Sequence, residues 1–165
     1  MDEIECRTQL TVSLRELADA SNLESMVEVF RDRIGSCFAA DLVCVALFRL
    51  KTWDMCLADA TTVRRWSVQR SENDLLGCAL GGIRPMYIPN LEKASSLLGL
   101  ESPEFWLSER SFESWVGLPI RSGNRLIGVL SLYAERSSAF DSERFFLIQN
   151  FSDHLALRLM LEACA

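Results

Sequence analysis

The chain has 165 residues, of which 49% are apolar and 24% are charged, and its formal net charge is −6. This composition excludes a disordered chain, and the length suits one domain over residues 1–165 with a sizeable core. The acidic balance and the lack of a long lysine and arginine stripe make nucleic acid and anionic membrane poor partners.

Targeting and cysteine patterns favour a cytoplasmic protein. No apolar run approaches the ~18 residues that a membrane helix needs, and the acidic start MDEIE lacks the plan of a signal peptide. The six cysteines are scattered without a C-x-x-C pair, which indicates a reducing compartment. Most of them lie inside apolar segments, so we interpret each as a core residue.

Two amphipathic helices are predicted at the start of the chain. The first runs from about Thr8 to Ala20, with one apolar stripe. The second begins at Ser21, because Ser21 and Glu24 have the S-x-x-E spacing of a capping box. Its apolar stripe consists of Leu23, Met26, Val27, Phe30, Ile34 and Cys37.

The next two segments read as strands. Residues 41–50 form a nearly continuous apolar run, which predicts a strand buried on both faces. Residues 53–63 predict a weaker second strand, and the pattern over residues 61–70 is ambiguous.

The middle of the chain predicts a helix, a short strand and a long connection. The helix covers residues 71–80, with Ser71 as its N-cap and Gly81-Gly82 at its end. Residues 86–88 read as a short strand. Residues 89–112 are irregular with one or two helical turns, and connections of this length are usually functional or mobile.

Residues 113–134 predict the central feature, a β-hairpin of two apolar strands. The turn contains Gly123 and Asn124, the residues best able to adopt the positive φ that such turns require. Both faces of the hairpin are largely apolar, so we expect it to be covered on both sides. Gly117 and Gly128 are expected to let a ligand or a helix approach closely.

The last helix, Ser142 to about Ala163 after the cap Asp141, carries two apolar stripes. One stripe is Phe145, Ile148, Leu155, Ala156 and Leu159, and the offset stripe is Leu147, Phe151 and Leu161 beside His154 and Arg158. One stripe suffices to dock on a sheet, so we predict that the second pairs with another copy in a homodimer. Hairpin-joined strands with helices at both ends of the chain indicate the α+β class.

Three segments resemble a GAF domain, a small sensory and regulatory module. Residues 76–90, LGCALGGIRPMYIPN, are similar to the family's helix–turn–strand passage ending in P-x-x-I-x-D, with Asn90 in place of Asp. Residues 114–132 resemble its S-x-x-x-x-P-I and I-G-V-L-x-L hairpin, and residues 140–143, FDSE, resemble its entry into the last helix. The resemblance, judged from these segments in order, covers nearly the whole chain.

The resemblance implies a twisted antiparallel sheet with the terminal helices, residues 1–20 and 141–163, on one face, where they often dimerise. It implies a ligand pocket on the other face, under the middle helix and the long loop before the hairpin. Some members reduce free methionine sulfoxide or attach a bilin through cysteines near that loop, but residues 95–113 contain none. The N-K-x-F-D signature of cyclic-nucleotide-binding members is also missing.

No catalytic or metal site is predicted. His154 is the only histidine, and the resemblance places it on the terminal helix away from the pocket. No spacing of Cys, His or carboxylates suggests converging metal ligands, so we assign no cofactor.

The candidate ligand-binding residues are aromatic and polar side chains, the types that small-molecule sites use. They are Phe48, Arg64, Trp66, Arg84, Tyr87, Trp106, Trp115 and Ser131, with Arg64 or Arg84 as an anion clamp. The favoured hypothesis is a non-enzymatic sensory module that binds a small ligand and signals through its terminal helices. The alternatives are a ligand-free dimerisation scaffold and a GAF-fold enzyme such as a free methionine sulfoxide reductase.

Overall fold

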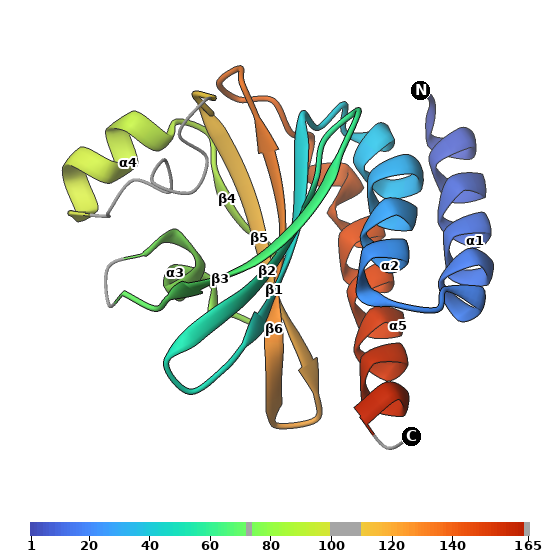
Figure 1. Ribbon diagram of the computed structural model, residues 1–165. Helices are drawn as coiled ribbons and strands as arrows, with labels where there is room; N and C mark the ends of the chain where they lie inside the picture. Colours follow the sequence, from blue (N-terminus) through green and yellow to red (C-terminus); the bar gives the residue numbers. More distant parts are fainter. Residues whose placement is uncertain (72–73, 100–109, 164–165) are drawn as a thin grey trace.

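One antiparallel sheet of six strands, in the order β3-β2-β1-β6-β5-β4, organises the chain (Figure 1). The computed structural model describes residues 1–71, 74–99 and 110–163. The strands are β1 (Leu42–Phe48), β2 (Thr52–Ala58), β3 (Val63–Gln69), β4 (Met86–Ile88), β5 (Ser114–Ser122) and β6 (Arg125–Ala134). The predicted α+β class is confirmed, with a single antiparallel sheet and helices packed on it.

The helices divide between the two faces of the sheet. Those at the two ends of the chain pack on one face, and α3 and α4 lie on the other (Figure 1). Their bounds are α1 (Glu3–Asp19), α2 (Leu23–Val29), the π-helix η1 (Phe30–Gly35), α3 (Leu75–Ala79), α4 (Leu91–Leu98), the 3₁₀ turn η3 (Ser142–Arg144) and α5 (Phe145–Ala163). Within the described part of the chain, no helix has the length and apolar character to cross a bilayer.

The β5–β6 hairpin forms as predicted. Ser122 pairs with Arg125, so the loop is the two residues Gly123 and Asn124. Gly123 has φ +59°, whereas Asn124 does not adopt positive φ, which corrects that part of the prediction. The turn therefore needs the freedom of glycine only at its first loop position.

Gly117 and Gly128 admit close neighbours, but neither neighbour is a ligand or a helix. A Cβ at Gly128 would lie 2.2 Å from the backbone oxygen of Ala46 in β1. A Cβ at Gly117 would lie 2.1 Å from the indole of Trp115 in the same strand. Both glycines thus serve the packing of the sheet itself.

The prediction that the offset stripe of the last helix needs a second copy rests on a wrong premise. Leu147 and Phe151 are fully buried, and the Phe151 ring stacks on Phe30 with centroids 5.0 Å apart. The N-terminal helices of the same chain therefore cover this stripe, and only Leu161, 66% exposed, remains outside. Dimerisation stays a prediction and must depend on other side chains.

The N-terminal helices begin at other residues than predicted. α1 starts at Glu3, because Asp2 and Glu5 form a capping box ahead of the expected Thr8. Asn22, rather than Ser21, caps α2, and its side-chain oxygen accepts from Ser25 N at 2.8 Å. Ser and Asn side chains can both accept a hydrogen bond from a backbone N–H of the first helical turn, so the S-x-x-E spacing alone does not identify the N-cap residue.

The elements between residues 61 and 98 also differ from the predictions in their bounds and caps. α3 is shorter than the predicted helix and is capped by Asp74 instead of Ser71. The ambiguous segment 61–70 contains the edge strand β3, and the long connection contains α4, a helix of eight residues. The short strand at residues 86–88 is confirmed as β4.

Candidate functional site

The candidate site is the sheet face beneath α3 and α4. Strand side chains alternate between faces, so every second residue of the central strands points toward these helices. The buried strand residues on this face are Leu42, Cys44, Ala46, Trp53, Met55, Leu57, Ile88, Trp115, Val129, Ser131 and Tyr133. Most are apolar, so the few polar atoms among them determine what the face can bind.

Three of those polar atoms lie on the adjoining strands β5 and β6. Trp115 and Ser131 are 0% and 1% exposed, and Tyr133, the cross-strand partner of Trp115, is 0% exposed. Burial and the nearby Cys44 thiol raise the pKa of Tyr133 well above its usual value, and hydrogen bonding by Ser131 and Trp115 opposes that shift.

The contacts of Ser131 and Trp115 with this hydroxyl are poorly aligned. Neither the Ser131 Oγ nor the Trp115 Nε1 has a partner in hydrogen-bond geometry within the described structure. Buried donors of this kind are rare in native cores, because an unmade hydrogen bond leaves the desolvation penalty uncompensated.

Asp74 fixes α3 over this face. Its carboxylate is buried, caps α3, and accepts from the Trp53 Nε1 of β2 and from the Ser71 backbone N–H, both at 3.1 Å. The contact with Trp53 therefore ties the start of α3 to the sheet.

Five of the predicted ligand-binding residues share this face. Trp115 and Ser131 form part of the polar group described above, while Phe48 and Trp66 are half-buried against the same core. Arg64 is exposed on β3 opposite Leu57, a residue of that core. The Phe48 ring contacts Trp53, with centroids 5.6 Å apart, and Arg70 lies 4.1 Å above Phe48.

The other three predicted residues are not in this group. Tyr87 lies on the opposite face, where its hydroxyl accepts from Phe140 N at 3.2 Å and its ring contacts Phe145 of α5. Arg84 is exposed in the loop before β4, and Trp106 lies outside the described residues.

Sequence reasoning did not select Tyr133, Asp74 or Phe112 for this site. Strand alternation could have found Tyr133, because it lies two residues after Ser131 and so shares its face. The Phe112 ring packs against Tyr133 with centroids 5.4 Å apart. Phe112 precedes β5 in a segment without periodicity, so no pattern identified it.

The five cysteines in the described residues are free, and four of them are poorly suited to thiolate chemistry. Burial raises the pKa of Cys37 and of Cys56 to about 12, and it also raises the pKa of Cys44 and Cys78. His154 is exposed on α5. No group of three or more His, Cys, Asp or Glu side chains in the described ranges could hold a metal ion.

Two grooves lined by described residues lie away from the polar group. One, of about 640 Å³, separates the end of α5 from the sheet, and the other, of about 550 Å³, lies beside η1. Neither is lined by Trp115, Ser131 or Tyr133.

Comparison with known families gives one decisive match: the family model for the GAF domain covers residues 22–159. The chain belongs to the GAF domain family. A search of curated proteins finds no match to this GAF domain.

Solved structures share its fold at low sequence identity. The GAF domain of an Acinetobacter phosphoenolpyruvate-protein phosphotransferase is 14% identical with a TM-score of 0.79, covering 100% of this chain and 98% of that one. The chromophore-binding domain of the R. palustris bacteriophytochrome RpBphP3 is 16% identical with a TM-score of 0.75, covering 98% and 63%. The free methionine-R-sulfoxide reductase of Neisseria meningitidis is 16% identical with a TM-score of 0.68, covering 94% and 88%. GAF domains of this fold thus occur in signalling proteins and in an enzyme.

Proposed function

We propose that this GAF domain is a non-enzymatic regulatory module of a signalling protein that binds a small ligand beneath α3. The observation that carries the proposal is the buried polar group on β5 and β6, where the Trp115 Nε1 and the Ser131 Oγ lack well-formed partners. A ligand with a hydrogen-bond acceptor would satisfy both donors. The free cysteines favour a cytoplasmic setting.

The ligand we propose is small and uncharged. The indole N–H is a donor only, and the hydroxyls of Ser131 and Tyr133 can donate or accept. The two described arginines nearest this core already have contacts, because Arg121 donates to the Leu80 carbonyl at the end of α3 and Arg70 lies over the Phe48 ring. Neither approaches Trp115 or Ser131 in a printed contact, so an uncharged ligand fits the group better than an anion. Arg64, exposed at the edge, is the one predicted cation on this side of the sheet.

A signal could pass through the sheet to the terminal helices. Val116 and Leu118 alternate with Trp115 along β5 and belong to the core that α5 covers. A ligand that displaces Trp115 therefore acts on a strand whose other side supports α5. We propose that the ligand shifts the population between two packings of α5 on the sheet.

The terminal helices carry an exposed seam suited to a homodimer. His154, Leu157 and Leu161 follow the alternating spacing of three and four of a coiled-coil seam, and the two leucines are 62% and 66% exposed. α1 lies beside α5 and presents exposed residues with the same spacing (Figure 1). They are Ile4, Thr8, Thr11, Arg15 and Ala18. We propose that a second copy packs along this seam.

One observation favours the second candidate, a ligand-free dimerisation scaffold. The Trp115 indole lies over Gly117 and Phe112 packs on Tyr133, so the chain's own rings cover part of the face. A reductase activity is supported by the fold of the Neisseria enzyme. The raised pKa of the described cysteines with resolved shifts counts against it, because the thiolate is the reactive form.

Thermal shift across a metabolite panel, with native mass spectrometry of the purified protein, tests the proposal. A ligand that binds only the folded state raises the melting temperature, and we expect Ser131→Ala and Trp115→Phe to abolish the shift. Ser67→Ala, on the exposed edge strand β3, is the matched control and should keep it. A panel without any binder would favour the scaffold, and turnover of methionine sulfoxide with a thiol donor would favour the enzyme.

A further inference from the structure

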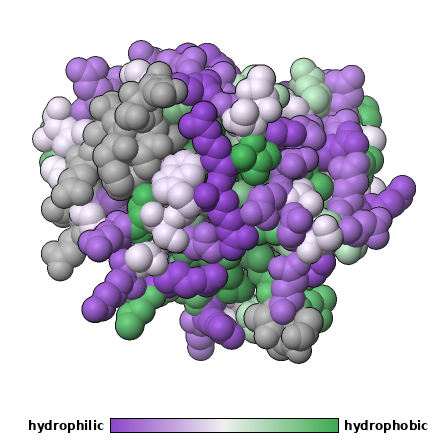
Figure 2. Space-filling model, in the orientation of Figure 1, coloured by the Kyte–Doolittle hydropathy of each residue, from purple (hydrophilic) through white to green (hydrophobic). Residues whose placement is uncertain are grey.

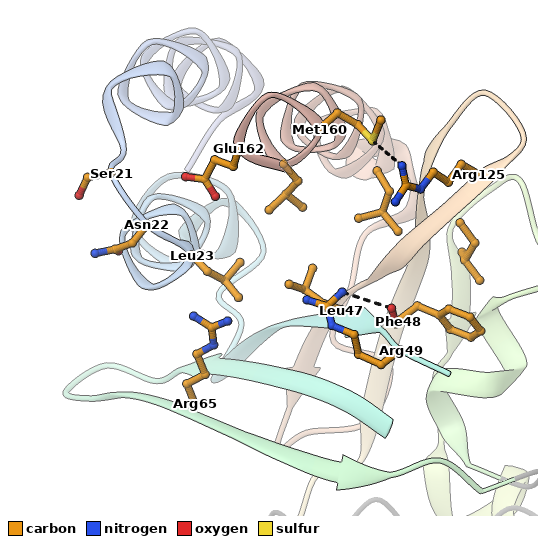
Figure 3. A pocket seen from close by; sticks show the side chains of 13 residues that line it. Ser21, Asn22, Leu23, Leu47, Phe48, Arg49, Arg65, Arg125, Met160 and Glu162 are labelled. Carbon is orange, nitrogen blue, oxygen red and sulfur yellow. Dashed lines mark hydrogen bonds between the residues drawn. The ribbon is translucent and has the colours of Figure 1, made fainter. Parts of the chain in front are cut away.

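A groove of about 640 Å³ lies on the other side of the domain, between the end of α5 and the sheet (Figure 3). Its walls come from the α1–α2 connection, the end of β1, the start of β6, β3 and the last turns of α5. It has the volume of a small-molecule site, and it shares no lining residue with the polar group beneath α3.

The floor and inner walls of the groove are apolar. Leu23 and Leu47 are buried at its base, and five half-buried residues complete the apolar surface. These are Phe48, Leu126, Ile127, Leu159 and Met160. Such a surface favours contact with an aliphatic group, because burial removes apolar area of both from water.

The charged side chains around the groove are mainly arginines. Arg49, Arg65 and Arg125 line it, together with one carboxylate, Glu162. Figure 3 shows Glu162 on the side of Asn22 and Leu23, and Arg125 beside Met160 on the opposite side. The rim is therefore basic at one end, although the whole chain has a net charge of −6.

The three arginines differ in their ion pairs. Arg65 is held by Asp54 at 2.9 Å and by Glu24 at 3.3 Å. Arg49 is paired more weakly, because it reaches only the same Asp54 carboxylate, at 3.7 Å.

Arg125 has no carboxylate within ion-pair distance in the described ranges, and its printed contact is with Met160 Sδ at 3.9 Å. Glu162 is itself paired with Arg158, at 3.5 Å. An anion near Arg125 would thus gain charge-assisted hydrogen bonds without displacing an ion pair, and Arg49 would give up only its 3.7 Å contact with Asp54, which Arg65 still holds.

We propose that this groove binds a small amphipathic carboxylate, with its anionic head between Arg49 and Arg125 and its aliphatic chain on the leucines of the floor. The head then lies away from Glu162. The bound molecule would contact α5, the α1–α2 connection and the sheet at once, and so hold the C-terminal end of α5 against the sheet. This site goes beyond the proposed function, which concerns the opposite face.

Calorimetric titration with decanoate tests the proposal, with decanol and acetate as probes that lack the charge and the chain. We expect decanoate to bind and the other two to bind at least about tenfold more weakly. The double variant Arg49→Gln and Arg125→Gln should weaken decanoate binding about tenfold or more. Lys93→Gln, which removes an exposed cation from α4 on the opposite side of the sheet, is the matched control and should leave binding unchanged.

A second measurement on the unaltered chain does not depend on variants that fold. In an NMR titration that follows backbone amides, decanoate should change the chemical shifts of Leu126, Ile127 and Leu159 and leave the chemical shift of Ser131 unchanged. The proposal is overturned if decanoate does not bind, if the double variant binds it as well as the unaltered chain, or if the shifts centre on Ser131. In that last case decanoate would be a ligand of the face beneath α3.

Discussion

The indole of Trp115 lies across Gly117, two residues further along the same strand. A Cβ built at Gly117 would come 2.1 Å from Trp115 Cζ2 and 2.3 Å from Cη2. Positions 115 and 117 lie on the same sheet face, under α3, and the indole of Trp115 occupies the space that a side chain at Gly117 would need. This places the indole N–H near the Ser131 and Tyr133 hydroxyls.

Gly117→Ala should therefore displace the indole and destabilise the domain. Overpacking of a fixed core typically costs about 1–3 kcal/mol of unfolding free energy. Urea unfolding measures this loss, and near-UV circular dichroism reports the displaced tryptophan. Gly81→Ala is the control, because a Cβ there meets nothing within 4 Å. Equal stability of both variants would contradict the packing described here.

Ser114→Ala should lower the stability of the domain, whereas Ser131→Ala should not, although both serines are buried. Ser114 Oγ donates to the Arg136 carbonyl at 2.7 Å, so its loss should cost about 1 kcal/mol or more. Ser131 Oγ has no well-formed partner in the described structure, so its removal should be neutral or stabilising by up to about 1 kcal/mol. Chemical denaturation of the ligand-free proteins measures the unfolding free energy of each variant against the unaltered chain. A clear loss of stability for Ser131→Ala would assign that hydroxyl to the core instead of to a ligand.

Leu157→Glu with Leu161→Glu should convert a dimer to monomers without unfolding them, because both side chains are exposed. Sedimentation velocity measures the change, and the melting temperature of the monomer checks the fold. Phe151→Ala serves as the contrast. It removes a buried ring stacked on Phe30 and should cost about 3–5 kcal/mol of stability. If the unaltered chain sediments as a monomer at micromolar concentration, the dimer proposal fails.

The acid stability of the domain should depend on Asp59. Hydrogen bonds from the Thr61 backbone N–H first, and from Thr62, lower the pKa of Asp59 from 3.8 to about 2. A lowered pKa stabilises the folded state above the unfolded pKa, and this contribution is lost as the pH falls from 3.8 toward 2. Asp59→Asn keeps the acceptor oxygen but cannot titrate, so its stability should fall less steeply over this range. Parallel acid-unfolding curves for the two proteins would contradict this assignment.

The sequence by itself determined most strands of the sheet and the helices that pack on it, and the resemblance to GAF domains implied how those helices divide between its faces. The apolar run at residues 41–50, the hairpin at 113–134 and the helical stripes are local patterns, and alternation or a period of 3.6 converts them directly into structure. Trp115 and Ser131 were chosen for their residue types, and strand alternation explains why they share one face with Tyr133.

Only the tertiary structure decided what each face packs against. A stripe of Leu147 and Phe151 is the same pattern whether a second chain or Phe30 of the same chain covers it, and Tyr87 can face either side of a short strand. The groove at Arg49 and Arg125 joins residues from both halves of the chain, so no local pattern could reveal it. Sequence periodicity fixes which side chains share a face, because the backbone repeats locally; the identity of the neighbour depends on long-range packing that no short segment contains.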